Sequence, residues 1–139
     1  MREFKDKEEV FEYIREKYSN ADSVLVKGSS VKDLVDFGDI DVEFYQDKPA
    51  KPEYELVLAE GKLLLISAYP YKAGKQKKDV PENVLLLKGN YPEQIENQEE
   101  YTPSERKLRD NQMLIDMLFK YMRTKDKKCI KSIEKYLKI

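Results

Sequence analysis

Apolar side chains in the first third of the chain change from a helical to an extended spacing. They first recur every three or four residues, at Val10, Phe11, Ile14 and Tyr18. This spacing predicts a helix, and Asp6 precedes it as the expected capping residue. The β-branched run 23–27 then predicts a buried strand, and residues 39–45 alternate between polar and apolar positions as a second strand does.

The middle of the chain has the pattern of a β-hairpin. Residues 54–59 and 62–69 are strand-like and flank Glu60-Gly61, which is a typical two-residue hairpin turn. The second strand is apolar on both faces at residues 63–66. Because a strand of this kind must be covered on both sides, we expect it at the centre of the sheet.

The last third of the chain is expected to end in two helices. Residues 83–88 predict one more strand, while 70–82 and 91–103 are polar and are expected to be loops. Helices are then expected from 104 to about 123 and from about 126 to 137.

The longer of these helices is apolar around much of its circumference. Its two adjoining apolar stripes are Leu108, Ile115, Phe119 and Met122, and Leu114, Met117, Leu118 and Tyr121. Such a helix requires burial on more than one side. The sheet and the last helix can supply that burial, and a homodimer or a helical partner protein is an equal alternative.

The order of elements predicts the fold class. A helix, a strand, a brief helix, several strands and two helices indicate an α/β (α+β) fold, in which a mixed sheet is flanked by helices. The length of 139 residues fits one domain, 1–139, with the chemically distinctive region at 23–69 and a helical pair at about 104–137.

The composition of the chain limits where the protein is expected in the cell and which residues could carry out catalysis. The chain lacks an apolar run long enough to span a membrane and a signal-peptide core, and we expect it in the cytoplasm. Its one cysteine, Cys129, excludes an internal disulfide and is expected in the core. The absence of histidine removes the usual zinc ligand and general base. Abundant Lys and Glu without His or Trp is typical of a thermophile.

Charge is distributed unevenly. The formal net charge is −1, which gives no global argument for binding nucleic acid. From Lys120 to Ile139, however, eight basic residues accompany two acidic ones. This end is expected to be a solvated helix face, and RNA binding through it is an alternative.

Residues 27–41 combine two devices that phosphate chemistry needs. In Lys27-Gly28-Ser29-Ser30, glycine permits close approach of an anion to the backbone, and Ser29 or Ser30 is expected to cap a brief helix through Asp36. In Asp39-Ile40-Asp41-Val42, the two carboxylates share one face of a strand because side chains alternate. Lys27 and Lys32 lie nearby and could add positive charge.

Two carboxylates on one strand face suit Mg²⁺ together with phosphate oxygens. A site for two metal ions usually includes a third carboxylate. Glu55 is our choice for it, at the start of the next strand, and Glu43 is the rival because it shares the face of Asp39 and Asp41.

These motifs resemble the signature of the DNA polymerase β-like nucleotidyltransferase superfamily, and especially its minimal members, which resemble the N-terminal domain of kanamycin nucleotidyltransferase. The likeness covers residues 23–69, and Lys27 interrupts an otherwise apolar approach to the glycine. The resemblance implies transfer of a nucleoside monophosphate from an NTP to an acceptor, with two Mg²⁺ ions. It also implies that Asp39 and Asp41 are metal ligands. Under the same resemblance, the triphosphate contacts Gly28, Ser29 and Ser30.

The sequence therefore predicts a Mg²⁺-dependent nucleotidyltransferase. Its expected metal and catalytic residues are Asp39, Asp41 and Glu55, and its expected nucleotide-binding residues are Gly28, Ser29, Ser30 and Lys32. ATP is the expected NTP, and the acceptor is a protein, an RNA or a small molecule. An alternative, which also draws on the resemblance, is an antitoxin or regulator that binds a helical toxin-type partner.

Overall fold

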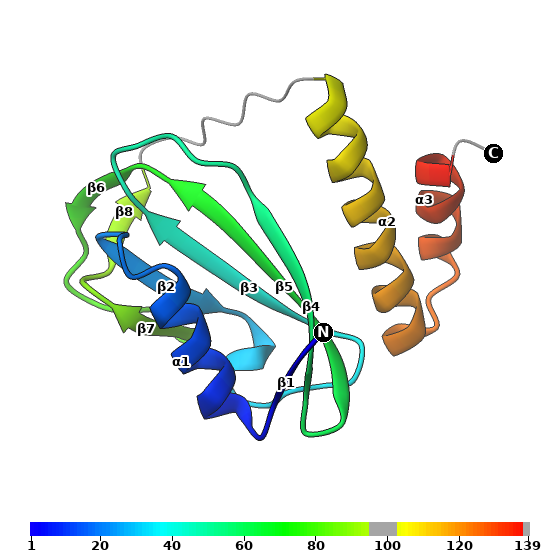
Figure 1. The fold of residues 1–139 in the computed structure, drawn as a ribbon, viewed down its shortest axis with the longest axis horizontal. Coiled ribbons are helices and arrows are strands. Elements are labelled where there is room, and N and C mark those ends of the chain that lie inside the picture. The colour runs from blue at the N-terminus through cyan, green and yellow to red at the C-terminus, as the bar shows by residue number, and fades with distance from the viewer. Residues whose placement is uncertain (95–102, 138–139) are drawn as a thin grey trace.

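The computed structural model describes residues 1–94 and 103–137. It confirms the predicted fold class, because a mixed sheet is flanked by helices, two of them C-terminal (Figure 1). The elements are β1 (Arg2–Phe4), α1 (Lys7–Lys17), β2 (Ser23–Lys27), the 3₁₀ turn η1 (Ser29–Val31), β3 (Gly38–Tyr45), β4 (Glu53–Ala59), β5 (Lys62–Tyr71), β6 (Ala73–Gln76), β7 (Val84–Lys88), β8 (Pro92–Gln94), α2 (Pro103–Thr124) and α3 (Lys128–Leu137).

The main sheet mixes parallel and antiparallel pairs. In the described residues it has six strands in the order β1-β4-β5-β3-β2-β7. β3 pairs antiparallel with β2 and parallel with β5, and β5 pairs antiparallel with β4. β5 therefore lies inside the sheet, as its apolar pattern predicted. Glu60 and Gly61 form the β4–β5 turn with φ values of 55° and 70°, which a type I′ turn requires.

One face of the sheet carries the main core. Ile40, Val42 and Phe44 of β3 all point to this face, where α1 covers them. α1 contributes Val10, Phe11 and Ile14, which are the residues that its helical spacing singled out. Asp6 caps the helix as expected and accepts a hydrogen bond from the Glu9 backbone N–H at 3.0 Å.

The other face of the sheet carries the carboxylates of β3 beside a second, smaller apolar cluster of Leu25, Tyr45 and Tyr91, and it receives α2. The ring of Phe119 on α2 packs edge-on against Phe37, with centroids 5.6 Å apart. Arg123 of the same helix donates a hydrogen bond to the Phe37 carbonyl at 3.0 Å. α3 packs on α2, and Figure 1 shows the two helices side by side, beyond the sheet from α1. Cys129 of α3 is buried, as predicted.

The structure corrects several local expectations. The brief helix expected to end at Asp36 is only the 3₁₀ turn η1, and neither Ser29 nor Ser30 caps it. The segments 70–82 and 91–103 were expected to be loops, but β6 and β8 lie in them and pair with each other. The rest of the second segment, 95–102, lies outside the described residues. Within the described residues, no helix combines the length and apolarity needed to cross a membrane.

Candidate functional site

The acidic residues of β3 lie on the polar face of the sheet. Because alternate residues of a strand share a face, Asp39 and Asp41 point away from the core that holds Ile40 and Val42. The antiparallel register of β2 and β3 sets Lys27 opposite Asp41. The end of β2 therefore brings the glycine–serine turn to the two carboxylates.

The turn and the carboxylates line one cavity of about 180 Å³. The residues around it are Lys27, Gly28, Ser29, Ser30, Asp33, Leu34, Val35, Gly38, Asp39, Asp41, Leu64 and Arg123. The structure thus brings together five of the seven residues that the sequence singled out. This shared cavity is the candidate functional site.

Gly28 and Ser30 give the turn its particular chemistry. Gly28 has φ 91° and ψ −163°, a conformation that is essentially restricted to glycine. A Cβ built on Gly28 would meet no described atom within 4 Å, so the backbone is open to a ligand on that side. Ser30 is 4% exposed, and its hydroxyl has no hydrogen-bond partner among the described residues. An unpaired buried hydroxyl is costly, and an ordered water, an ion or a catalytic role usually accounts for one.

The carboxylates repel one another in this partly buried place. Burial raises the pKa of Asp39 to about 8, with the negative charges of Asp41 and Asp116 adding to it. Ser67 of β5 opposes this rise by donating a hydrogen bond to Asp39 at 3.2 Å. Burial and the charge of Asp41 also raise the pKa of Asp116, while Arg123 opposes the increase. Such a group of acids favours a cation.

Asp116 and Arg123 are contributions of α2 that the sequence motifs did not reveal. They are seven residues apart, so both lie on one side of the helix. A signal for Asp116 was present: it is the one charged residue in the apolar run 113–119. For Arg123, sequence gives no comparable signal, because a basic residue is common in the last turn of a helix.

The prediction that Glu55 joins Asp39 and Asp41 is wrong. Glu55 pairs in register with Ile66, which belongs to the core, and so it faces α1 on the opposite side of the sheet. There its Oε1 atom accepts hydrogen bonds from the Tyr13 hydroxyl at 2.6 Å and Lys17 Nζ at 3.1 Å.

Glu55 instead ties β4 to α1 and β1. Besides the bonds from Tyr13 and Lys17, it pairs with Arg2 at 3.3 Å. Burial alone would raise the pKa of Glu55, but the two hydrogen bonds and the positive charges of Lys17 and Arg2 outweigh it and lower the pKa. Its role in the structure is an ionic link between elements.

Two further candidates also lie differently from expectation. Glu43 does share the face of Asp41. Its carboxylate, however, forms an ion pair with Lys27 Nζ at 2.8 Å and accepts a hydrogen bond from the Tyr45 hydroxyl at 2.6 Å. Lys32 is exposed after the turn and is not among the described residues that line the cavity. Its carbonyl accepts a hydrogen bond from Lys7, at the start of α1.

The residues fit a hard cation through their oxygen atoms. Within residues 1–94 and 103–137, no set of three or more His, Cys, Asp or Glu side chains is arranged to hold a metal ion by itself. The adjacent carboxylates of Asp39 and Asp41 are nevertheless the donors that Mg²⁺ prefers, and Mg²⁺ usually completes its shell with waters and phosphate oxygens. Burial first, and then the neighbouring acids, raise the pKa of Asp39 and so disfavour its negative charge, which a bound cation would offset.

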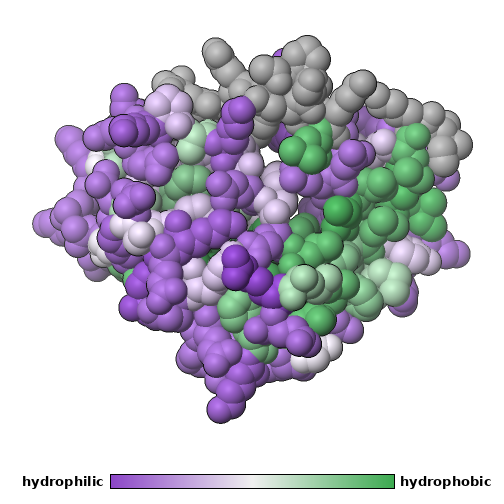
Figure 2. Space-filling model, viewed as in Figure 1, coloured by the Kyte–Doolittle hydropathy of each residue, from purple (hydrophilic) through white to green (hydrophobic). Residues whose placement is uncertain are grey.

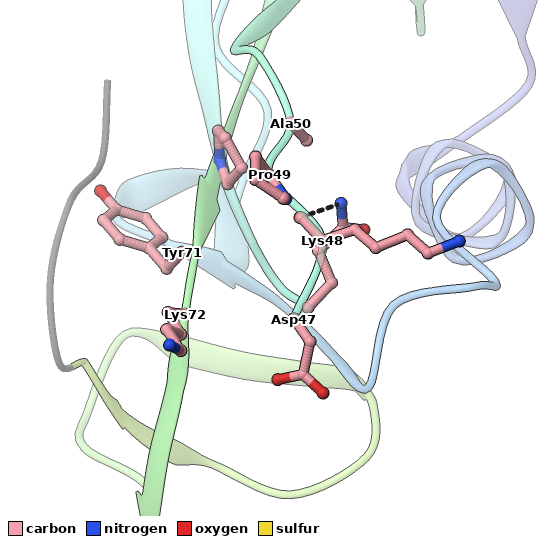
Figure 3. A pocket seen from close by; sticks show the side chains of 8 residues that line it. Asp47, Lys48, Pro49, Ala50, Tyr71 and Lys72 are labelled. Atoms are coloured by element: carbon pink, nitrogen blue, oxygen red, sulfur yellow. Dashed lines mark hydrogen bonds between the residues drawn. The ribbon is translucent and has the colours of Figure 1, made fainter. Parts of the chain in front are cut away.

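A second, smaller hollow lies at the far ends of β3 and β5. Its volume is about 60 Å³, and it is lined by Gln46, Asp47, Lys48, Pro49, Ala50, Pro70, Tyr71 and Lys72. Figure 3 shows these side chains around the loop after β3, where Gln46 donates a hydrogen bond to the Lys48 carbonyl at 3.0 Å. None of the sequence-predicted site residues lines it, so we place the candidate site in the larger cavity.

Comparison with known proteins adds no relative: no family model, no curated protein and no solved structure matches this chain.

The ionic link at Glu55 predicts a pH-dependent contribution to stability. Since its pKa is lowered in the folded state, Glu55 stabilises the fold above its usual value of 4.5, and this contribution is lost as the pH falls through the folded pKa. Glu55→Gln should therefore reduce the free energy of unfolding by about 1–2 kcal/mol at pH 7. Urea denaturation at pH 7 and pH 3 should show the difference shrinking at the lower pH.

Glu12→Gln is the matched control, because among the described residues the partner of Glu12 is exposed Arg15 of the same helix. We expect this substitution to change stability by less than about 0.5 kcal/mol. A deficit in Glu55→Gln that is equally large at both pH values would contradict the ionic role of Glu55.

The crowded carboxylates predict the opposite behaviour at Asp39. Because its pKa is raised, the folded state disfavours the charged form, and Asp39 costs stability increasingly as the pH rises from 3.8 to about 8. Without divalent cations, Asp39→Asn should be more stable than the wild type at pH 8, by about 2 kcal/mol, and equal to it near pH 4. Thermal unfolding across this range measures the difference.

Exposed Asp79 provides the control substitution, Asp79→Asn, which we expect to have no such pH trend. If Asp39→Asn were less stable than the wild type at pH 8, the account of repelling carboxylates would be wrong.

Proposed function

We propose that this chain is a Mg²⁺-dependent nucleotidyltransferase, which moves a nucleoside monophosphate from an NTP to an acceptor hydroxyl. The observation that carries the proposal is the shared cavity, where a Gly-Ser-Ser turn with an unpaired buried hydroxyl faces two carboxylates. The turn supplies donors for phosphate oxygens, and the carboxylates supply oxygens for a cation. A magnesium-bound polyphosphate requires both at once.

Each part of the cavity has a role in this proposal. Ser29, Ser30 and the backbone at Gly28 contact the phosphate chain, and Arg123 adds positive charge from the α2 side. Asp39 and Asp41 would hold the metal. Bound Mg²⁺ would neutralise the phosphate oxygens and orient the chain for attack.

The transfer forms one bond and breaks another. The acceptor oxygen bonds to the α-phosphorus, the bond from that phosphorus to the bridging oxygen breaks, and pyrophosphate leaves. Asp116 replaces Glu55 in our proposal as the third acid. Its negative charge acts on Asp39, and the charge of Asp41 acts on it, so Asp116 is the acid that we assign to take the proton of the acceptor hydroxyl.

ATP is the proposed donor, the acceptor is a protein, an RNA or a small molecule, and the proposed location is the cytoplasm. The formal net charge of −1 gives no global argument for binding polyanions, so the proposal rests on the groups that line the cavity.

A second candidate function is that of a binding module for a helical partner protein. The observation that favours it is apolar surface on α2 and α3, where Leu108, Leu118, Met122, Ile130 and Leu137 are exposed. Figure 2 shows apolar surface gathered on the side of the molecule where these helices lie. The two candidates are compatible, because the apolar residues and the cavity lie on different parts of α2.

Asp41→Asn tests the first proposal. With Mg²⁺ and ATP at about 100 times the dissociation constant, the wild type should gain about 2.7 kcal/mol and several degrees in melting temperature. Asp41→Asn should lose the Mg²⁺-dependent part of this gain while remaining folded. It should also reduce pyrophosphate release by about 100-fold or more. The proposal fails if Asp41→Asn and Asp39→Asn both keep wild-type turnover.

Met122→Glu tests the second candidate. If an adjacent reading frame encodes an all-helical protein, the two purified proteins should form a complex that Met122→Glu weakens by at least about tenfold, since a charge would be buried in an apolar contact. Isothermal titration calorimetry measures the affinity. Val80→Glu, at an exposed apolar residue away from α2 and α3, should leave it unchanged. Equal affinities for both variants would exclude this surface.

A further inference from the structure

Lys27 stands where the two halves of the cavity meet. It is the last residue of β2 and directly precedes Gly28. Its register partner on β3 is Asp41, and its side chain lines the cavity with the turn. Its ammonium group lies against Glu43, the next residue after Asp41 on this face of β3.

A buried carboxylate fixes the position of this ammonium group. Glu43 is 8% exposed, and its Oε1 atom lies 2.8 Å from Lys27 Nζ. Its Oε2 atom accepts a hydrogen bond from the buried Tyr45 hydroxyl at 2.6 Å. The Tyr45 ring in turn stacks on Tyr71, with centroids 5.5 Å apart. Both oxygens of Glu43 are thus used, and the acid cannot turn away from Lys27 without leaving a buried charge unpaired.

Stability alone does not account for the Lys27–Glu43 pair. Two apolar side chains would fill this place without the cost of desolvating two charges. The Lys27 side chain also keeps 36% of its surface exposed, so it is not sealed in the interior. An ammonium group has three donors, and its contact with one oxygen of Glu43 leaves donors for a ligand in the cavity.

The other lysine near the turn lacks these features. Lys32 is exposed and is not among the described residues that line the cavity. A lysine of this kind must lose the motion of its side chain when it binds a ligand, whereas Lys27 has already been positioned. Only Lys27 of the two is therefore suited to bind an anion beside Gly28.

We propose that Lys27 binds the phosphate chain of the substrate together with the Gly-Ser-Ser turn, and that Glu43 and Tyr45 are positioning residues that set where its ammonium group lies. This inference rests on the proposed function of the cavity and adds the substrate group that the cavity selects. The ligand class is a magnesium-bound polyphosphate, held at one end of its chain by a fixed cation.

The test uses inorganic tripolyphosphate with Mg²⁺, because this probe contains the phosphate chain and needs no acceptor. Isothermal titration calorimetry on the full chain compares the wild type with Lys27→Met, Lys27→Arg and the control Lys32→Met. We expect Lys27→Met to weaken binding by at least about tenfold, a typical effect of losing a charge-assisted hydrogen bond. Lys27→Arg should restore part of the affinity, and Lys32→Met should change it by less than about twofold.

Glu43→Gln separates positioning from simple charge. If Glu43 acts only by repelling the anion through its negative charge, Glu43→Gln should tighten the binding of tripolyphosphate. If Glu43 instead positions Lys27, Glu43→Gln should weaken the binding of tripolyphosphate, and this is the result that we expect. In the Lys27→Met background, Glu43→Gln should have no further effect, since the group that it positions is absent.

The double variant Lys27→Met/Glu43→Gln keeps the test informative if Lys27→Met alone does not fold. Lys27→Met alone leaves Glu43 buried and unpaired, whereas Lys27→Met with Glu43→Gln leaves neither charge and keeps an acceptor for the Tyr45 hydroxyl. Thermal unfolding without ligand identifies any variant that is not folded. If Lys27→Met does not fold, the double variant should show the same loss of tripolyphosphate affinity.

The outcomes distinguish this inference from the function on which it rests. If the wild type binds tripolyphosphate and the folded Lys27 variants bind it equally well, Lys27 is not the phosphate contact, while the nucleotidyltransferase proposal stands. The same conclusion follows if the wild type binds ATP but not tripolyphosphate. Tighter binding by Glu43→Gln would overturn the positioning role. If the wild type binds neither ATP nor tripolyphosphate, both the role of Lys27 and the nucleotidyltransferase proposal are wrong.

Discussion

The site depends on the pairing of β3 with strands on both sides. β2 fixes it from one edge and β5 from the other, so its two faces cannot exchange. Ile40 and Val42 are buried beneath α1, and this burial holds Asp39 and Asp41 on the opposite face. The packing of the apolar side thus keeps the two carboxylates together on one face, although they repel each other.

The polar face combines groups that lower stability with groups that compensate for it. Asp39 has a raised pKa because burial and neighbouring acids disfavour its charge, and the Ser30 hydroxyl is buried without a described partner. Glu43 is buried as well, but Lys27 and Tyr45 satisfy both of its oxygens. Uncompensated groups are therefore concentrated at the cavity, which is the usual distribution in a binding site.

Sequence reasoning succeeded where the relevant geometry is local. Asp39 and Asp41 share a face because they are two residues apart, and Gly28 lies at the end of a recognisable strand. Glu55 was misplaced because its face depends on the β4–β5 register, and a shift of one residue reverses it. Asp116 is remote from the motif in sequence, and its approach depends on the docking of α2, which no local pattern specifies.

Helix α2 carries charged side chains on one side and exposed apolar side chains on another. Arg123 lines the cavity and Asp116 lies on the same side of the helix, while Leu118 and Met122 are exposed. A molecule that covers the exposed residues and displaces the helix also displaces the carboxylate and the guanidinium group. Thermodynamic reciprocity then applies: if occupancy of the cavity alters affinity for the outer molecule, that molecule alters affinity in the cavity by the same factor. Under the two proposals together, occupancy of the cavity and binding on the outer side of α2 would be linked through this one helix.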